Sequence, residues 1–148
     1  MFRALLVGVP VLLLCVLGQA MFLGWSLRVY GRRRSFLGKS KVAWPEMLLL
    51  TTVMLILLLG NIIPMLVWAA LFVAIGAIGD FSTAFYHSAV NFVTLGYGDI
   101  VMPGRWRMLG PMESATGIMM FGVSTAVMTA AVMDIVKLNR DSLGMSDD

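Results

Sequence analysis

The sequence has little of the side-chain chemistry that enzymes and metal sites use. It contains one histidine and one cysteine among 148 residues, and His87 and Cys15 lie far apart in the chain. A single cysteine excludes an internal disulfide framework, and no group of residues has the spacing of a metal site or an activated nucleophile. The 13 methionines are scattered, which indicates adaptable packing rather than copper binding. We therefore expect neither an enzyme nor a protein with a bound cofactor.

Charged residues are also scarce. They make up 13% of the chain, whereas 59% of the residues are hydrophobic and the mean hydropathy is +0.90, which is typical of a membrane protein. The net charge of +3 depends on a basic stretch with no acid in it: Arg28, Arg32, Arg33, Arg34, Lys39 and Lys41. Its position between apolar segments favours a cytoplasmic loop beside anionic lipid headgroups and argues against a nucleic-acid partner.

Three apolar segments are long enough to cross a hydrocarbon core, which takes about 20 helical residues. We expect these helices over residues 4–27, 47–78 and 108–136. Pro45 and Glu46 favour a helix start directly after the basic stretch. The second helix is too long to stand upright, and Pro64 supplies a cause for a bend.

Residues 80–102 are too few and too polar to cross the membrane twice, so we expect them to be re-entrant. Asp80 or Ser82 can cap a short helix over residues 83–93, and the negative end of its dipole would face a cation. The run TLGYGD follows at residues 94–99. Gly96 and Gly98 permit left-handed backbone without a Cβ clash, and stacked carbonyl oxygens can replace the hydration shell of K⁺. The run predicts a potassium filter, and such backbone at membrane depth requires neighbouring subunits.

Residues 84–132 resemble the two-helix pore domain of potassium channels, most closely that of small bacterial members. The resemblance rests on TLGYGD, on the preceding FYHSA at residues 85–89 and on GIMMFG at residues 117–122. It implies a homotetramer in the bacterial inner membrane with K⁺ as the permeant ion. The implied filter residues are Thr94, Leu95, Gly96, Tyr97, Gly98 and Asp99. The first four would offer K⁺ their carbonyl oxygens, Thr94 also its hydroxyl, and Asp99 a carboxylate at the outer mouth.

The sequence departs from the family behind the filter. Val90 and Val93 stand where relatives often carry Glu and Thr, so the usual clamping hydrogen bonds are in doubt. Our hypothesis is that Glu113 takes over part of this clamp, because an ionisable residue near the outer end of a spanning helix is costly unless it is paired. Its candidate partners are Tyr86, His87 and Asn91. An equally open alternative is that Glu113 reaches the membrane interface and pairs with Arg105 or Arg107.

Other residues have two interpretations each. His87 is a candidate for pH gating, although we favour a packed, neutral ring. Asp134 could belong to a carboxylate ring at the inner mouth or pair with Lys137 or the basic stretch. In the third helix, Gly117 or Gly122 could be a hinge, and a small residue there could equally serve close helix packing.

The basic stretch also predicts the topology. By the positive-inside rule, it lies in the cytoplasm with the C-terminus, and the N-terminus lies outside with the re-entrant segment. A cleaved signal peptide over residues 1–20 is the alternative, and the length of the first apolar segment argues against it. We divide the chain into a transmembrane helix with a basic cytoplasmic loop (1–45), a potassium-channel pore domain (46–140) and a short cytoplasmic tail (141–148).

The predicted fold is an all-α membrane protein with three transmembrane helices, a re-entrant pore helix and a filter loop. No segment carries arginine at every third position, which argues against a voltage sensor. The function we expect is passive, potassium-selective conduction. The alternatives are a weakly selective cation channel, since Val90 and Val93 could loosen the filter, and a non-conducting subunit or regulator that needs a partner.

Overall fold

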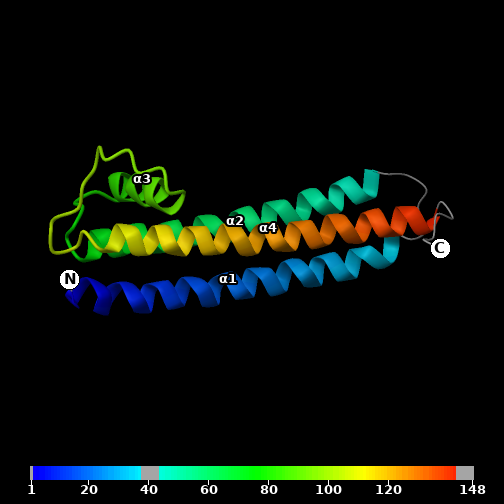
Figure 1. Cartoon of the computed structure of the whole chain (residues 1–148), viewed down its shortest axis with the longest axis horizontal. Coiled ribbons are helices and arrows are strands. Elements are labelled where there is room, and N and C mark those ends of the chain that lie inside the picture. The colour runs from blue at the N-terminus through cyan, green and yellow to red at the C-terminus, as the bar shows by residue number, and fades with distance from the viewer. Residues whose placement is uncertain (1, 38–43, 143–148) are drawn as a thin grey trace.

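The computed structural model describes residues 2–37 and 44–142, and the regular structure within them is entirely helical. The helices are α1 (Phe2–Leu37), α2 (Trp44–Ala74), α3 (Phe81–Phe92) and α4 (Leu109–Ser142). Three segments are long and apolar enough to cross a membrane, namely Phe2–Arg33, Trp44–Ala74 and Leu109–Lys137. The long helices lie side by side, and short α3 lies at one end of them (Figure 1). The predicted all-α fold is confirmed.

Helix α2 begins as its sequence predicts, with Pro45 and Glu46 in the first turn, and it continues through Pro64. Its predicted end at residue 78 is wrong, because the helix stops at Ala74. The carbonyl oxygen of Phe72 accepts hydrogen bonds from the backbone N–H groups of Ala77 and Ile78, and Gly76 has a φ of 64° between them. Glycine adopts this left-handed conformation at little cost, so the chain turns there toward α3.

Helix α1 is longer than the apolar segment that predicted it. It continues through Arg28, Arg32 and Arg33 as far as Leu37, so the arginines are helical and their assignment to a loop is wrong. The reason is that hydropathy marks where a helix leaves the membrane, not where it ends, and arginine is a good helix former. Lys39 and Lys41 lie outside the described residues.

The packing places α3 between two of the long helices. It contacts α2 and α4 but not α1, which packs along the α2–α4 pair on the other side (Figure 1). Most of the largest fully buried side chains gather at this junction: Trp68 and Phe72 from α2, Phe92 from α3, and Leu109 and Met120 from α4. The ring of Phe92 meets that of Phe121 edge to face at 5.5 Å. The core thus holds the end of α3 against α4. The segment that follows α3 therefore starts from this fixed contact.

Candidate functional site

Helix α3 begins at a side-chain cap. Asp80 has extended backbone, and its carboxylate accepts hydrogen bonds from the Thr83 backbone N–H at 2.9 Å and the Thr83 hydroxyl at 3.0 Å. Of the two predicted caps, the structure therefore uses Asp80, and α3 starts at Phe81, two residues before the expected position. The hydrogen bonds from Thr83 hold the pKa of Asp80 below its ordinary value, because they stabilise the charged carboxylate.

Residues 94–99, which the sequence predicts to be the filter and which we call the filter strand, alternate between left-handed and ordinary backbone. The φ angles of Thr94, Gly96 and Gly98 are 59°, 59° and 77°, and no residue between them has a positive φ. The two glycines were expected from the sequence, but Thr94 was not, because positive φ in a β-branched residue costs about 1–3 kcal/mol and persists only where surrounding contacts impose it. The alternation turns successive carbonyl oxygens toward one side of the strand.

Backbone hydrogen bonds impose this conformation on the strand. The N–H of Thr94 donates to the Asn91 carbonyl at 2.9 Å, and those of Leu95 and Gly96 donate to the Val90 carbonyl at 2.9 and 3.4 Å. The buried Val90 side chain cannot form the clamp that a Glu would form there, but its carbonyl oxygen holds two residues of the strand. The last carbonyl groups of α3 are thereby used to anchor the start of the filter strand.

The C-terminal end of the strand is held by a side chain of α3. The Tyr86 hydroxyl donates to Asp99 Oδ2 at 2.8 Å, and the other carboxylate oxygen of Asp99 accepts from the Ile100 N–H at 3.0 Å. Tyr86 was proposed as a partner of Glu113, and that pairing is wrong. The reason is geometric: Tyr86 lies on the half-exposed side of α3, whereas Glu113 is buried.

Glu113 lies in the interface between α3 and α4 and has no exposed surface. Its Oε1 accepts a hydrogen bond from the Ser88 hydroxyl, and its Oε2 lies 3.4 Å from Asn91 Nδ2, which donates to it. The Ser88 hydroxyl also lies 2.8 Å from the Met65 carbonyl oxygen of α2. Glu113 therefore joins the network behind the filter strand. Asn91 was expected as a partner, whereas Ser88 was missed.

The interface alternative for Glu113 does not fit this geometry. The Arg105 guanidinium lies over the Trp106 ring, 5.7 Å from its centroid, and both Arg105 and Arg107 are exposed. A fully buried carboxyl group cannot reach an exposed guanidinium and keep its contacts with α3. The side chain of Glu113 is oriented toward the pore helix instead.

His87 belongs to the same network through a neighbour. Its Nε2 lies 3.0 Å from Asn91 Nδ2, and its ring packs edge to face on Phe72 at 5.6 Å. Burial lowers the pKa of His87, because the charged ring would lose its water, while the charge of Asp99 acts in the opposite direction. The packing and the shift both favour a neutral ring over a pH switch.

The two glycines of the third transmembrane helix that were predicted as hinges, Gly117 and Gly122, differ sharply in their surroundings. A Cβ atom at Gly117 would lie 1.9 Å from the Phe92 carbonyl oxygen, whereas one at Gly122 would meet nothing within 4 Å. The Ser114 hydroxyl, one turn before Gly117, donates to the Asn91 carbonyl at 2.8 Å. Gly117 therefore serves the close approach of α4 to the end of α3, which is the packing interpretation, and Gly122 has no such contact.

Asp134 has a partner that the sequence did not suggest. The Tyr30 hydroxyl of α1 donates to Asp134 Oδ2 at 2.7 Å and lies 3.3 Å from the Ala131 carbonyl oxygen. This contact joins α1 to the last turns of α4. The Asp134 carboxylate is thus oriented toward α1.

Comparison with known families identifies this arrangement. A model of the ion channel family matches residues 51–134, more than half of the chain, from the third turn of α2 into the last turns of α4. The chain belongs to the ion channel family. No curated protein and no solved structure matches it. The matched residues of the channel include the filter strand and all of its supports. Together with the three membrane-length helices, this membership makes the molecule a multi-pass membrane protein of an ion channel family, and α1 and the part of α2 before residue 51 lie outside the matched region.

Proposed function

We propose that this channel is a potassium-selective homotetramer that conducts K⁺ passively along its electrochemical gradient. The observation that carries the proposal is the alternating backbone of the filter strand, with positive φ at Thr94, Gly96 and Gly98. Carbonyl oxygens turned to one side can replace the water around K⁺. Thr94, Leu95, Gly96 and Tyr97 supply these ligands, and Thr94 adds its hydroxyl. K⁺ is the transported ion, and backbone carbonyl oxygens are the ligands that these residues offer it.

The exposure of the filter strand supports a tetramer. All side chains from Val93 to Asp99 are exposed in the single chain, and those of Leu95 and Tyr97 have 52% and 68% of their surface accessible. Non-helical backbone at membrane depth is stable only when it is covered by protein or lines a water-filled cavity. One chain contributes one strand, so a closed cage of oxygens needs copies around an axis, and rotational symmetry provides them.

The supports of the strand favour selectivity. Tyr86 fixes Asp99 at the outer end, the Val90 carbonyl fixes Leu95 and Gly96 at the inner end, and Glu113 with Asn91 buttresses α3 between them. A strand held at both ends presents its oxygens at a fixed spacing, and the number and position of those oxygens decide which ion gains most from binding.

The arrangement of the termini supports the proposed topology. The N-terminal end of α1 lies at the same end of the molecule as α3, and the C-terminal ends of α1 and α4 lie together at the opposite end (Figure 1). That opposite end carries Arg28, Arg32 and Arg33 of α1 together with Lys137 and Arg140 of α4. By the positive-inside rule it faces the cytoplasm, next to anionic headgroups of the cell membrane.

Reconstitution of the purified chain tests the proposal. The protein alone is placed in liposomes, K⁺ and Na⁺ fluxes are measured separately, and the mass of the detergent-solubilised particle gives the number of copies. We expect four copies and K⁺ flux far above Na⁺ flux. Equal fluxes of the two ions would replace the proposal with a weakly selective cation channel. A folded tetramer without flux would indicate a non-conducting subunit.

A matched pair of glycine variants controls for the filter. Gly96→Ala places a Cβ on a backbone with φ of 59°, where an L-residue costs about 1–2 kcal/mol. Gly122→Ala adds the same methyl group in open space. We expect the first variant to lose selective K⁺ flux and the second to retain it. Loss in both variants, or in neither, would contradict a conduction path through residues 94–99.

A further inference from the structure

Three neutral polar side chains meet where α1, α2 and α4 pack together. Gln19, Asn61 and Ser124 lie near the middle of the three membrane-length segments, and each is more than nine-tenths buried. Gln19 Nε2 donates to Ser124 Oγ at 3.2 Å, and Asn61 Nδ2 donates to the same oxygen at 3.5 Å. Gly60 permits this meeting, because a Cβ there would lie 3.2 Å from Gln19 Oε1. We call these three side chains the amide–hydroxyl cluster.

The cluster has more hydrogen-bonding capacity than its own contacts use. Both amide oxygens, Gln19 Oε1 and Asn61 Oδ1, are buried without a hydrogen-bond partner. Turning the Asn61 amide over would only exchange the unpartnered atom, since the NH₂ group would then lack an acceptor. An unsatisfied polar group in a medium without water costs free energy that a hydrogen-bonding ligand would recover.

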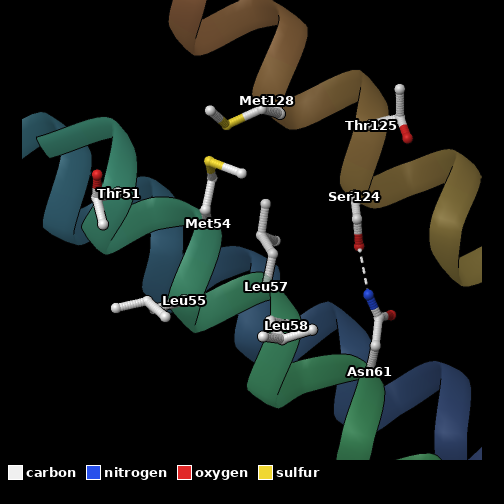
Figure 2. A pocket seen from close by; sticks show the side chains of 9 residues that line it. All are labelled: Thr51, Met54, Leu55, Leu57, Leu58, Asn61, Ser124, Thr125 and Met128. Carbon is white, nitrogen blue, oxygen red and sulfur yellow. Dashed lines mark hydrogen bonds between the residues drawn. The ribbon is translucent and has the colours of Figure 1, made fainter. Parts of the chain in front are cut away.

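A pocket of about 400 Å³ adjoins the cluster between α2 and α4. Figure 2 shows Asn61 and Ser124 at one side of it and the side chains of Met54, Leu57 and Met128 at the other. This volume is within the range of small-molecule sites, which are mostly apolar with a few polar groups that orient the ligand. The pocket therefore combines an apolar wall with a hydrogen-bonding end.

We propose that this pocket binds a small amphiphile with one hydroxyl group and a single short alkyl chain, that is, a medium-chain alcohol. The hydroxyl both donates and accepts, so it suits the Asn61 amide in either orientation and the Ser124 hydroxyl beside it. The alkyl chain lies among Met54, Leu58 and Met128, and methionine adapts to chains of different shape. The inference depends on the membrane location of the helices and not on potassium selectivity.

Other occupants satisfy the site less well. A phospholipid tail carries no donor, and its headgroup lies about 15 Å from the bilayer centre. A single water molecule occupies about 30 Å³ and would leave most of the pocket empty. The α4 helix of a second copy offers hydroxyls at this depth on Thr125 and Thr129, but both donate to carbonyl oxygens of their own helix. The alcohol offers a hydroxyl group to Asn61 and Ser124 and an alkyl chain to the apolar wall.

Photolabelling tests the site. The full chain in lipid nanodiscs is illuminated with an octanol that carries a diazirine on its alkyl chain, or with the matching octane, and the labelled residues are identified by mass spectrometry. We expect the alcohol to label residues 54–58 and 125–128 about five-fold more than the alkane, which corresponds to about 1 kcal/mol for one hydrogen bond. Excess unlabelled octanol should remove this difference.

Two variants identify the cause. Asn61→Leu keeps the size of the side chain and removes the amide, so alcohol labelling should fall to the alkane level. Met54→Trp fills the pocket from its apolar wall without touching the cluster and should lower labelling by both probes. Thr129→Val, one turn after Thr125 on α4 and outside the pocket lining, is the control and should change neither.

Three results would overturn the proposal. Equal labelling by both probes in the wild-type channel would make the pocket a site for lipid tails. Absence of labelling at residues 54–58 and 125–128 would mean that a neighbouring subunit covers it. Alcohol labelling that survives Met54→Trp would place the alcohol elsewhere. None of these measurements depends on ion flux, so a failure here is distinguishable from a failure of the proposed potassium selectivity.

Discussion

The contact between Gly117 and the end of the pore helix gives the sharpest prediction. An alanine Cβ at position 117 would lie 1.9 Å from the Phe92 carbonyl oxygen, whereas ordinary contact begins at 3.4 Å. The obstacle is backbone, so no side-chain rotation relieves it, and α3 and α4 must move apart. Overpacking of this kind costs about 1–3 kcal/mol, and we expect the upper end because the neighbour is rigid.

The movement reaches the filter strand directly. Phe92 is the last residue of α3, and the bonds from Leu95 and Gly96 to the Val90 carbonyl lie within the same turn. Gly117→Ala should therefore lower the thermal unfolding midpoint of the detergent-solubilised channel and reduce the ratio of K⁺ to Na⁺ flux. Both readouts are needed, because a stiffened hinge would change gating and leave the filter intact.

Gly122→Ala is the matched control. A Cβ at Gly122 meets nothing within 4 Å, and alanine stabilises a helix interior by up to about 1 kcal/mol relative to glycine. We expect an unchanged or slightly raised unfolding midpoint and an unchanged flux ratio. The reasoning is refuted if Gly117→Ala retains the wild-type midpoint and flux ratio, or if the two variants behave alike.

Variants at three further positions examine the supports of the filter strand and the cap of α3. Glu113→Leu removes two hydrogen bonds from the α3–α4 interface, at about 1 kcal/mol each. Glu113→Gln keeps the shape of the side chain and part of its hydrogen bonding. If single-channel recordings of both variants show unchanged selectivity and open-state lifetime, the clamp hypothesis is wrong. Tyr86→Phe deletes the hydrogen bond to Asp99 and should shorten the open-state lifetime in single-channel recordings. An open-state lifetime equal to that of the wild type would contradict a role of this hydrogen bond in holding the strand. The pKa of Asp80 is lower in the folded state than in the unfolded state. Its contribution to stability as a helix cap is therefore complete above the unfolded pKa and is lost as the pH falls through the folded pKa. The thermal unfolding midpoint of Asp80→Ala should consequently vary less at acidic pH than that of the wild type.

The sequence predicted the fold because long apolar segments have few alternatives. Residues 4–27, 47–78 and 108–136 correspond to α1, α2 and α4, and the capped helix between the second and third corresponds to α3. The ends were less predictable. Helix α1 continues through its arginines, since hydropathy does not report helix propensity, and α2 stops early where Gly76 permits a turn.

The filter strand was only partly predictable for a different reason. Glycine indicates where left-handed backbone is possible, so positive φ at positions 96 and 98 was expected. Thr94 has the same backbone against its own preference, and only the bonds that Val90 and Asn91 offer in the folded molecule impose it. No local pattern in the sequence carries that information.

The polar partners were the least predictable part of the site. Ser88 is a common residue on a helix, and it becomes a partner of Glu113 only because α3 and α4 pack with those faces together. The cluster of Gln19, Asn61 and Ser124 did leave a signal, namely a neutral polar residue near the middle of each apolar segment. The cluster contains no ionisable residue, but amides in a hydrocarbon environment also need hydrogen-bond partners.

One face of α4 is committed to the pore helix, and this restricts how the channel can gate. Gly117 follows Glu113 by four residues and Ser114 by three, so each pair lies on the same side of α4, and all three residues contact the last turns of α3. Rotation of this part of α4 would break three hydrogen bonds to α3, two at Glu113 and one at Ser114, and would move Phe92. Gly122 lies one turn further from α3 and is unrestrained within the chain. If α4 bends during gating, the bend therefore belongs at or beyond Gly122, and the segment from Glu113 to Gly117 moves only together with the filter.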